Sequence, residues 1–255
     1  MKAIQTAFTI ALPMRHRRPT STSSAYLMTL GKSASKNINV FFGCLLGLIL
    51  SGCSSANDYG VELPYDAWRL GFFAPNYMEV WIETANVVDV KGRLFRRAMS
   101  GVAAVQTPPN LKGTPRGWPK NPGDGAGKHV WRADVPRLIY VRWQSLAEPK
   151  TYDAYIDIPE QIQRSMREGG KTYCDASRVW IEDYRKNLVV GLAPGGVVKT
   201  WLMGVCIDAV EVSRVKGKVV EKGPDLGRTN GRYALELEPE SQAYIDKFGI
   251  PYDSW

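Results

Sequence analysis

The chain has 255 residues, with 33 Lys and Arg, 25 Asp and Glu, four Cys and two His. Hydrophobic residues make up 44% of it and charged residues 23%, values near the averages for globular proteins. This composition excludes a disordered chain, a collagen-like protein and a membrane protein with many spans. It is compatible with one globular domain whose core forms without a dense disulfide framework.

The first 52 residues have the order of a secretion signal. They hold six basic side chains and no acidic one, and their apolar segment, Val40–Leu50, is 11 residues long. A membrane-spanning helix needs about 20 apolar residues, whereas the core of a signal peptide needs about 7 to 15. We therefore expect residues 1–52 to be a signal peptide, with Met28 as an alternative start.

The signal ends in Leu50-Ser51-Gly52-Cys53, which resembles the lipobox of bacterial lipoproteins. The resemblance implies cleavage before Cys53 and a diacylglyceryl group on its thiol, and two or three acyl chains would hold the protein stably on a membrane. The alternative is an ordinary secreted protein. Ser54 and Ser55 lack the aspartate that tends to retain lipoproteins at the inner membrane. The resemblance thus implies a lipid anchor in the outer membrane, with the domain facing the periplasm.

Removal of the signal changes the charge of the protein. Loss of six of the 33 basic residues leaves 27 against 25 acidic ones, a net charge of only +2. One basic cluster remains, in the segment 91–97, and we interpret it as a solvated face. A nucleic acid partner is not expected, because phosphate binding needs an extended basic surface.

The mature chain is dominated by the two-residue alternation of half-buried strands. We expect a flexible tether over residues 53–66, followed by a single β-rich domain over 67–255. The predicted strands cover residues 67–73, 78–83, 139–144 and 152–157, with a further hairpin formed by 187–192 and 197–212 around the turn Ala193-Pro194-Gly195-Gly196. The last strand of the hairpin changes phase at residues 209–210, which suggests a bulge.

Two helices and one long loop complete the predicted elements. A helix should begin at Pro159 and end at Gly169-Gly170, because apolar residues recur there every four positions. Glu238–Phe248 predicts a second short helix. Five Pro and five Gly exclude regular structure from Thr107–Lys128, a loop that is either functional or a solvated insertion. The expected fold is mainly β, an antiparallel β-sandwich or curved sheet with one or two short helices.

No catalytic, cofactor or metal site is expected from the sequence. The mature chain has one histidine, His129, and no G-x-S-x-G motif, which leaves a Ser-His-Asp triad without support. With Cys53 lipidated, only Cys174 and Cys206 remain, too few for a thiolate zinc site. These two residues form either a disulfide or two buried free thiols.

A repeated pattern of an aromatic residue between two carboxylates marks a candidate partner surface. Its residues are Glu79, Trp81, Glu83, Asp153, Tyr155 and Asp157. Carboxylates four residues apart on one strand are roughly 13 Å apart, farther than the about 5 to 9.5 Å of glycosidase pairs. A hydrolase would therefore need a pair from two different strands. An exposed aromatic would mark a surface for a protein or a glycan, whereas a covered one would be structural.

Three groups of residues resemble a family of bacterial lipoproteins of unknown function. They are Pro136–Ser145 with Trp143 and Ser145, then Tyr152 and Tyr155, then Gly191–Val197 with Trp201, Leu202 and Gly204. Some members of that family lie beside type VI secretion toxins, particularly lipases. The resemblance implies a non-catalytic immunity protein that binds such a toxin in the periplasm. The alternative is a structural envelope lipoprotein that binds peptidoglycan or other glycans.

Overall fold

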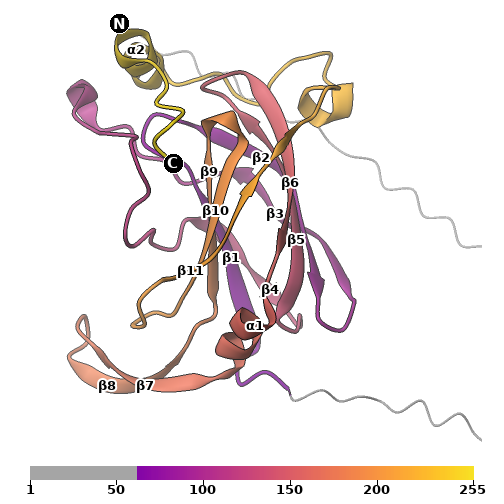
Figure 1. Cartoon of the computed structure of the whole chain (residues 1–255), viewed down its shortest axis with the longest axis vertical. Helices are drawn as coiled ribbons and strands as arrows, with labels where there is room; N and C mark the ends of the chain where they lie inside the picture. The colour runs from indigo at the N-terminus through magenta and orange to yellow at the C-terminus, as the bar shows by residue number, and fades with distance from the viewer. Residues whose placement is uncertain (1–61) are drawn as a thin grey trace, which may run out of the picture. The chain divides into compact units, whose positions relative to one another are not determined.

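The computed structural model describes residues 62–255. The signal peptide predicted over 1–52, its alternative start at Met28 and the lipid attachment point Cys53 lie outside the described residues. The described part is mainly β, which confirms the predicted fold class. Figure 1 shows two large sheets that pack against each other and a separate two-stranded hairpin at the end that carries the first helix.

The first large sheet has the strand order β11-β10-β9-β1-β4. Its strands are β1 (Ala67–Phe73), β4 (Ala126–Trp131), β9 (Asn187–Ala193), β10 (Val197–Met203) and β11 (Val210–Lys216). All neighbours are antiparallel except β1 and β9, which are parallel. The predicted hairpin around Pro194 is confirmed as β9 and β10, which pair from Val197 opposite Ala193 to Met203 opposite Asn187.

The second large sheet has the order β12-β6-β5-β2-β3 and is antiparallel throughout. Its strands are β2 (Val80–Asp89), β3 (Leu94–Val102), β5 (Pro136–Ser145), β6 (Lys150–Asp157) and β12 (Lys218–Val219). Strands β7 (Gly169–Cys174) and β8 (Val179–Tyr184) form the separate hairpin. The helices are α1 (Glu160–Arg167) and α2 (Pro239–Phe248), with short 3₁₀ turns at Pro109–Leu111, Pro194–Gly196 and Pro224–Gly227.

One core fills the space between the two large sheets. It is built from alternate residues of the strands, as the two-residue period requires. Its members include Trp68, Leu70 and Phe72 of β1, Ile139, Val141 and Trp143 of β5, and Leu188, Val190 and Leu192 of β9. Leu63 and Tyr65 pack against this core, so the final residues of the segment predicted as a tether, 53–66, belong to the domain.

The single strand expected over residues 197–212 is wrong. The structure divides it into β10 and β11, which fold back on each other as an antiparallel pair. The chain turns between them, where the Gly204 amide donates to the Ile207 carbonyl at 3.2 Å. The change of phase at residues 209–210 therefore marks the start of a new strand. A register shift does occur in this pair, between Thr200 and Trp201.

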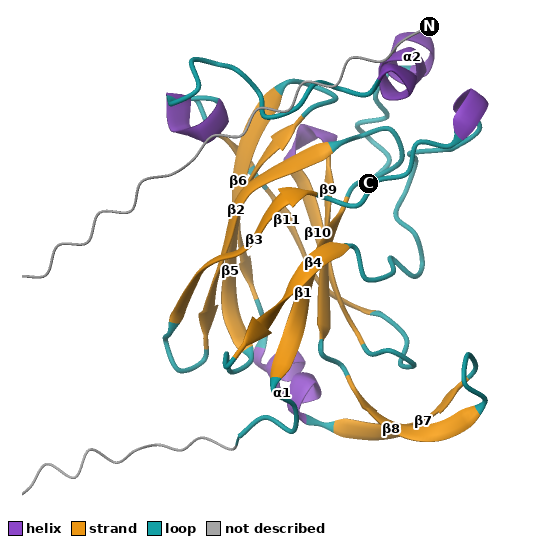
Figure 2. Cartoon of the chain, turned by 180° about the vertical axis from the view of Figure 1, so that it is seen from behind, coloured by secondary structure: helices purple, strands orange, loops and turns teal. Residues whose placement is uncertain are grey.

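Helix α1 follows β6 directly and covers one end of the sandwich (Figures 1 and 2). The predicted helix is present but shorter: it begins one residue after Pro159 and ends at Arg167, and Gly169 and Gly170 begin β7. Ile162 and Met166 are the residues that it buries in the core. Arg167 in its last turn forms an ion pair with the buried Asp134. Lys91 contacts the same carboxylate at 3.3 Å. The helix is therefore held by apolar packing and by a buried anion.

Strands β1 and β4 approach each other closely because glycines face each other across the pair. Gly71 lies opposite Gly127, and a Cβ atom on Gly127 would stand 2.1 Å from the Leu70 carbonyl oxygen. We expect Gly127→Ala to destabilise the protein by about 1 to 3 kcal/mol, because the backbone must shift to admit a methyl group. Urea unfolding measures this effect. The exposed His129 of the same strand provides the control, and equal stability of Gly127→Ala and His129→Ala would contradict the prediction.

Candidate binding surfaces

The six residues of the predicted partner surface do not form one surface. Glu79 is only 5% exposed, Glu83 has a largely buried side chain and Trp81 is half-buried. Tyr155, in contrast, is 63% exposed and Asp157 is also exposed. The β2 half of the predicted surface is covered by the protein's own C-terminal segment, and the β6 half faces solvent.

Glu79 binds the start of helix α2. Its carboxylate accepts hydrogen bonds from the hydroxyl of Ser241 and, at 3.1 Å, from the backbone amide of Glu238. Burial raises the pKa of Glu79 above its ordinary value, and the hydrogen bonds from Ser241 and Glu238 partly oppose that rise. This carboxylate therefore holds the C-terminal segment on the sheet and is not available to a partner.

Glu83 on β2 makes a second attachment of the C-terminal segment, four residues beyond Glu79, which lies just before this strand. Its side chain pairs with Arg142 on β5 and accepts a hydrogen bond from Gln144 at 2.9 Å. It also accepts the backbone amide of Asp225 at 2.6 Å. Gln144 accepts the amide of Ala234 at 2.8 Å, so the two strands bind the backbone of this segment at several points. Trp81 lines a cavity of about 470 Å³ beneath it.

The exposed half of the predicted surface, which we call the β6 surface, consists of Asp153, Tyr155 and Asp157 with Tyr140 of β5. Tyr140 lies directly opposite Tyr155, with their ring centroids 4.9 Å apart. The Tyr140 hydroxyl donates to Asp153 at 3.3 Å, and burial raises the pKa of this phenol above its ordinary value. The sheet thus presents an exposed aromatic ring, supported by a second ring, between two carboxylates.

The hairpin of β7 and β8, which we call the arm, is a second exposed surface that the sequence patterns do not predict. Tyr173 lies opposite Trp180, and their ring centroids are 5.7 Å apart. The two residues are 43% and 65% exposed. The opposite side of the arm carries Thr172 and Asp183, which bind the loop between β10 and β11. The arm therefore has one face turned to the domain and one aromatic face turned away.

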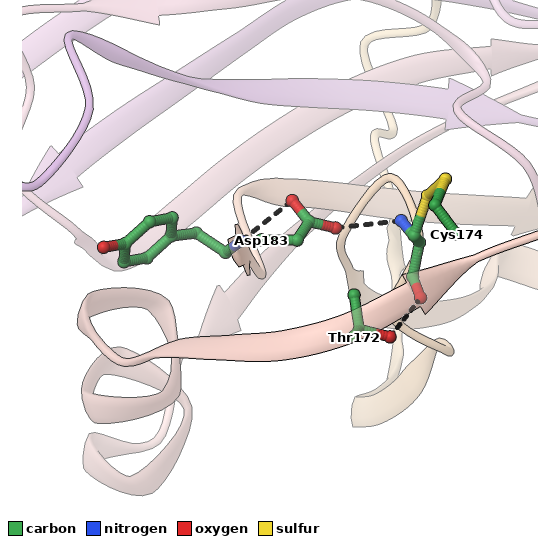
Figure 3. Close-up of a disulfide and its surroundings, with 5 residues drawn as sticks. Thr172, Cys174 and Asp183 are labelled. Carbon is green, nitrogen blue, oxygen red and sulfur yellow. Dashed lines mark hydrogen bonds between the residues drawn. A yellow bond between two sulfur atoms is a disulfide. The ribbon is translucent and has the colours of Figure 1, made fainter. Parts of the chain in front are cut away.

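A disulfide between Cys174 and Cys206 joins the arm to the body of the domain (Figure 3). The sequence leaves a disulfide and two free thiols open, and the structure has the disulfide because Gly169–Cys174 doubles back along β8. Asp183 supports it by accepting the Cys206 amide at 2.8 Å, and the Thr172 hydroxyl donates to the Cys206 carbonyl at 3.1 Å. These contacts fix the direction in which the arm projects.

The long loop predicted over Thr107–Lys128 covers the outer face of the first sheet and ends in β4. Its Trp118 packs edge to face on Phe73 and Trp201, each with ring centroids about 5.5 to 5.7 Å away. The loop also borders a cavity of about 650 Å³ whose lining residues include Asn76 and Asn121. The prediction that this segment lacks regular elements is correct for residues 112–125 and wrong for residues 126–128, which begin β4. The segment covers part of the sheet, so it has a structural role.

His129 lies exposed on β4, with its ring centroid 5.9 Å from that of Trp131. Within 62–255 no group of three or more His, Cys, Asp or Glu side chains is arranged to hold a metal ion. In the same range, no helix combines the length and the apolar character that a membrane span requires.

The fold and the surfaces together define a two-sheet β-sandwich protein with a disulfide-held hairpin arm. The family of proteins of unknown function DUF2931 matches residues 54–253, well over half of the 255-residue chain, and this protein belongs to that family. Searches of curated proteins and of solved structures found no match.

The raised pKa of Glu79 predicts a pH dependence of stability. The folded protein holds this proton more tightly than the unfolded chain, whose carboxyl has a pKa near 4.5. The free energy of unfolding should therefore fall as the pH rises from about 4.5 through the folded pKa, and this contribution should be constant above it. Urea unfolding of Glu79→Gln should lack this slope, whereas the control Glu236→Gln, at an exposed position, should keep it. Parallel pH profiles for wild type and Glu79→Gln would disprove the assignment.

Removal of the disulfide should destabilise the arm more than the rest of the domain. The cysteines are 32 residues apart in sequence, and in the chain-entropy model a loop of this length contributes roughly 3 to 4 kcal/mol. In the double variant Cys174→Ser, Cys206→Ser, we expect the free energy of global unfolding to fall by roughly this amount, and amide hydrogen exchange to accelerate more in β7 and β8 than in β5. Uniform acceleration across the domain would show instead that the arm is part of the global folding unit.

Proposed function

We propose that this protein is a non-catalytic lipoprotein, anchored to the outer membrane through Cys53 and facing the periplasm, that binds and neutralises a type VI secretion toxin such as a lipase. The lipobox and the signal that precedes it support the location. The family resemblance supports the toxin. The observation that carries a binding function is the β6 surface, where Tyr155 is 63% exposed on a rigid sheet.

The β6 surface has the chemistry of a protein-binding site. Tyrosine is enriched among the residues that dominate binding energies, because its ring buries a large area and its hydroxyl remains able to form a hydrogen bond. Contact of Tyr155 with Tyr140 restricts the ring before a partner arrives, which lowers the ordering cost of binding. Asp153 and Asp157 flank it, and these carboxylates would favour a partner with a basic surface.

A structural lipoprotein that binds peptidoglycan or another glycan is the second candidate. The observation that favours it is the cavity of about 650 Å³ at the long loop, whose lining residues include Asn76, Gln106 and Asn121 beside Trp118. Amide groups both donate and accept hydrogen bonds, as sugar hydroxyls require. Sedimentation with purified sacculi tests this candidate, and Asn121→Ala should reduce the bound fraction if the cavity is the site.

The toxin proposal predicts a loss of affinity at one position. The product of the adjacent gene should form a stoichiometric complex with this protein, and Tyr155→Ala should raise the dissociation constant at least about 10-fold, the effect of a central aromatic contact. Isothermal titration calorimetry measures this change. Trp180→Ala, which removes an equally exposed ring from the arm, is the matched control and should bind as the wild type does. If no complex forms, or if Tyr155→Ala binds normally, this function or this surface is wrong.

A further inference from the structure

The arm lies at the end of the sandwich where the chain enters the domain. Tyr65, in the segment that leads into β1, contacts the ring of Tyr184 at the base of the arm, with centroids 5.7 Å apart. Its hydroxyl also donates to the Met166 carbonyl of α1 at 2.7 Å. Figures 1 and 2 both show α1 and the arm at the same end of the two large sheets. The entry point of the chain, α1 and the base of the arm are therefore neighbours.

The number of residues between Cys53 and Tyr65 limits how far this end can stand from a membrane. Tyr65 follows Cys53 by 12 positions. A fully extended chain spans at most about 3.3 to 3.6 Å per residue, or about 40 Å over this segment. If Cys53 carries the lipid, the base of the arm stays within about that distance of the bilayer.

The strand register decides which side chains of the arm face away from the domain. Side chains alternate between the two faces of a hairpin, and Thr172, Cys174 and Asp183 are bound to the body. Tyr173 and Trp180 lie opposite each other on the other face, as do Lys171 and Glu182. The same face carries Tyr184, which packs against Tyr65 at the base of the arm. Beyond the base, this face carries two adjacent exposed rings and one pair of opposite charges.

We infer that this aromatic face of the arm lies on a phospholipid bilayer, with the rings of Tyr173 and Trp180 at the lipid–water interface. The inference rests on the lipid anchor of the proposed function and adds a second membrane contact to it. Trp and Tyr are enriched at this depth because they combine an apolar body with a polar group that stays hydrated. The rings are exposed, paired and held on a scaffold that the disulfide fixes to the domain.

The charges of the arm indicate that the rings, and not electrostatic attraction, make the contact. Lys171 and Arg178 are balanced by Asp175 and Glu182, so the exposed charged residues of the arm have no net charge. A basic surface would require anionic lipids and would lose affinity in salt. The arm should instead contact zwitterionic phosphatidylcholine as well as anionic lipid, and the contact should change little with ionic strength.

Quenching of tryptophan fluorescence by brominated acyl chains tests the contact. The full lipidated protein is reconstituted in phosphatidylcholine vesicles that contain a brominated phosphatidylcholine. Trp180→Phe should lose at least half of the quenching seen for the wild type. Trp131→Phe, which removes the other strongly exposed tryptophan, at 62%, should lose much less. Both positions are exposed, so neither change should disturb the core, and circular dichroism checks this.

The outcomes separate this inference from the proposed function. Mass spectrometry determines whether Cys53 carries lipid, and calorimetry with the toxin is a separate measurement. Absence of quenching in the lipidated protein, or equal quenching in wild type and Trp180→Phe, overturns the arm contact and leaves the proposed function standing. If Cys53 is unmodified, the same protein is added to preformed vesicles: quenching that depends on Trp180 supports the contact, and none overturns it. Loss of toxin binding in Trp180→Ala would assign the arm to a protein partner and also overturn it.

Discussion

Carboxylates on the outer face of the second sheet hold the backbone of the C-terminal segment, and the accessible surface of this protein depends on that attachment. Glu79 and Glu83 lie at positions where an antiparallel sheet normally presents polar side chains to water. Here their lone pairs accept backbone amides and a serine hydroxyl from residues 225–241. The polar face of β2 is therefore an internal contact, and the exposed part of this sheet moves to β6.

The outer face of the first sheet is also partly covered, in this case by the long loop. Trp118 in the long loop packs on Phe73 and Trp201, and the lack of a side chain at Gly191 gives its ring room, since a Cβ there would stand 2.5 Å from it. With both outer faces partly covered, several large exposed rings remain near α1 and the point of chain entry. They are Trp131 opposite Ala67, Tyr155 five residues before α1, and Tyr173 and Trp180 on the arm.

The sequence predicts elements whose apolar period is long and regular, and it misses those that depend on distant partners. Strands β5 and β6, helix α1 and the β9–β10 turn carry their signals within a few residues of one another. The arm has no such signal, because Gly169, Gly170 and the exposed Tyr173 and Trp180 break the alternation of a half-buried strand. The interior role of Glu79 and Glu83 is equally invisible, since the groups of the C-terminal segment that they bind lie 142 to 162 residues away.

The two proposed contacts constrain each other through the short connection between β6 and α1. Strand β6 ends at Asp157, three residues before Glu160, the first residue of α1. Helix α1 in turn contacts Tyr65 through the carbonyl of Met166. A partner on the β6 surface would thus be held at the same end of the domain as the arm, which we infer to lie on the bilayer. The partner would then be within reach of the lipid headgroups. For a toxin that attacks phospholipids, this geometry would favour inhibition where the enzyme meets its substrate. The lipid anchor would raise the local concentration of inhibitor at that surface, which is the effective-concentration advantage of a tether.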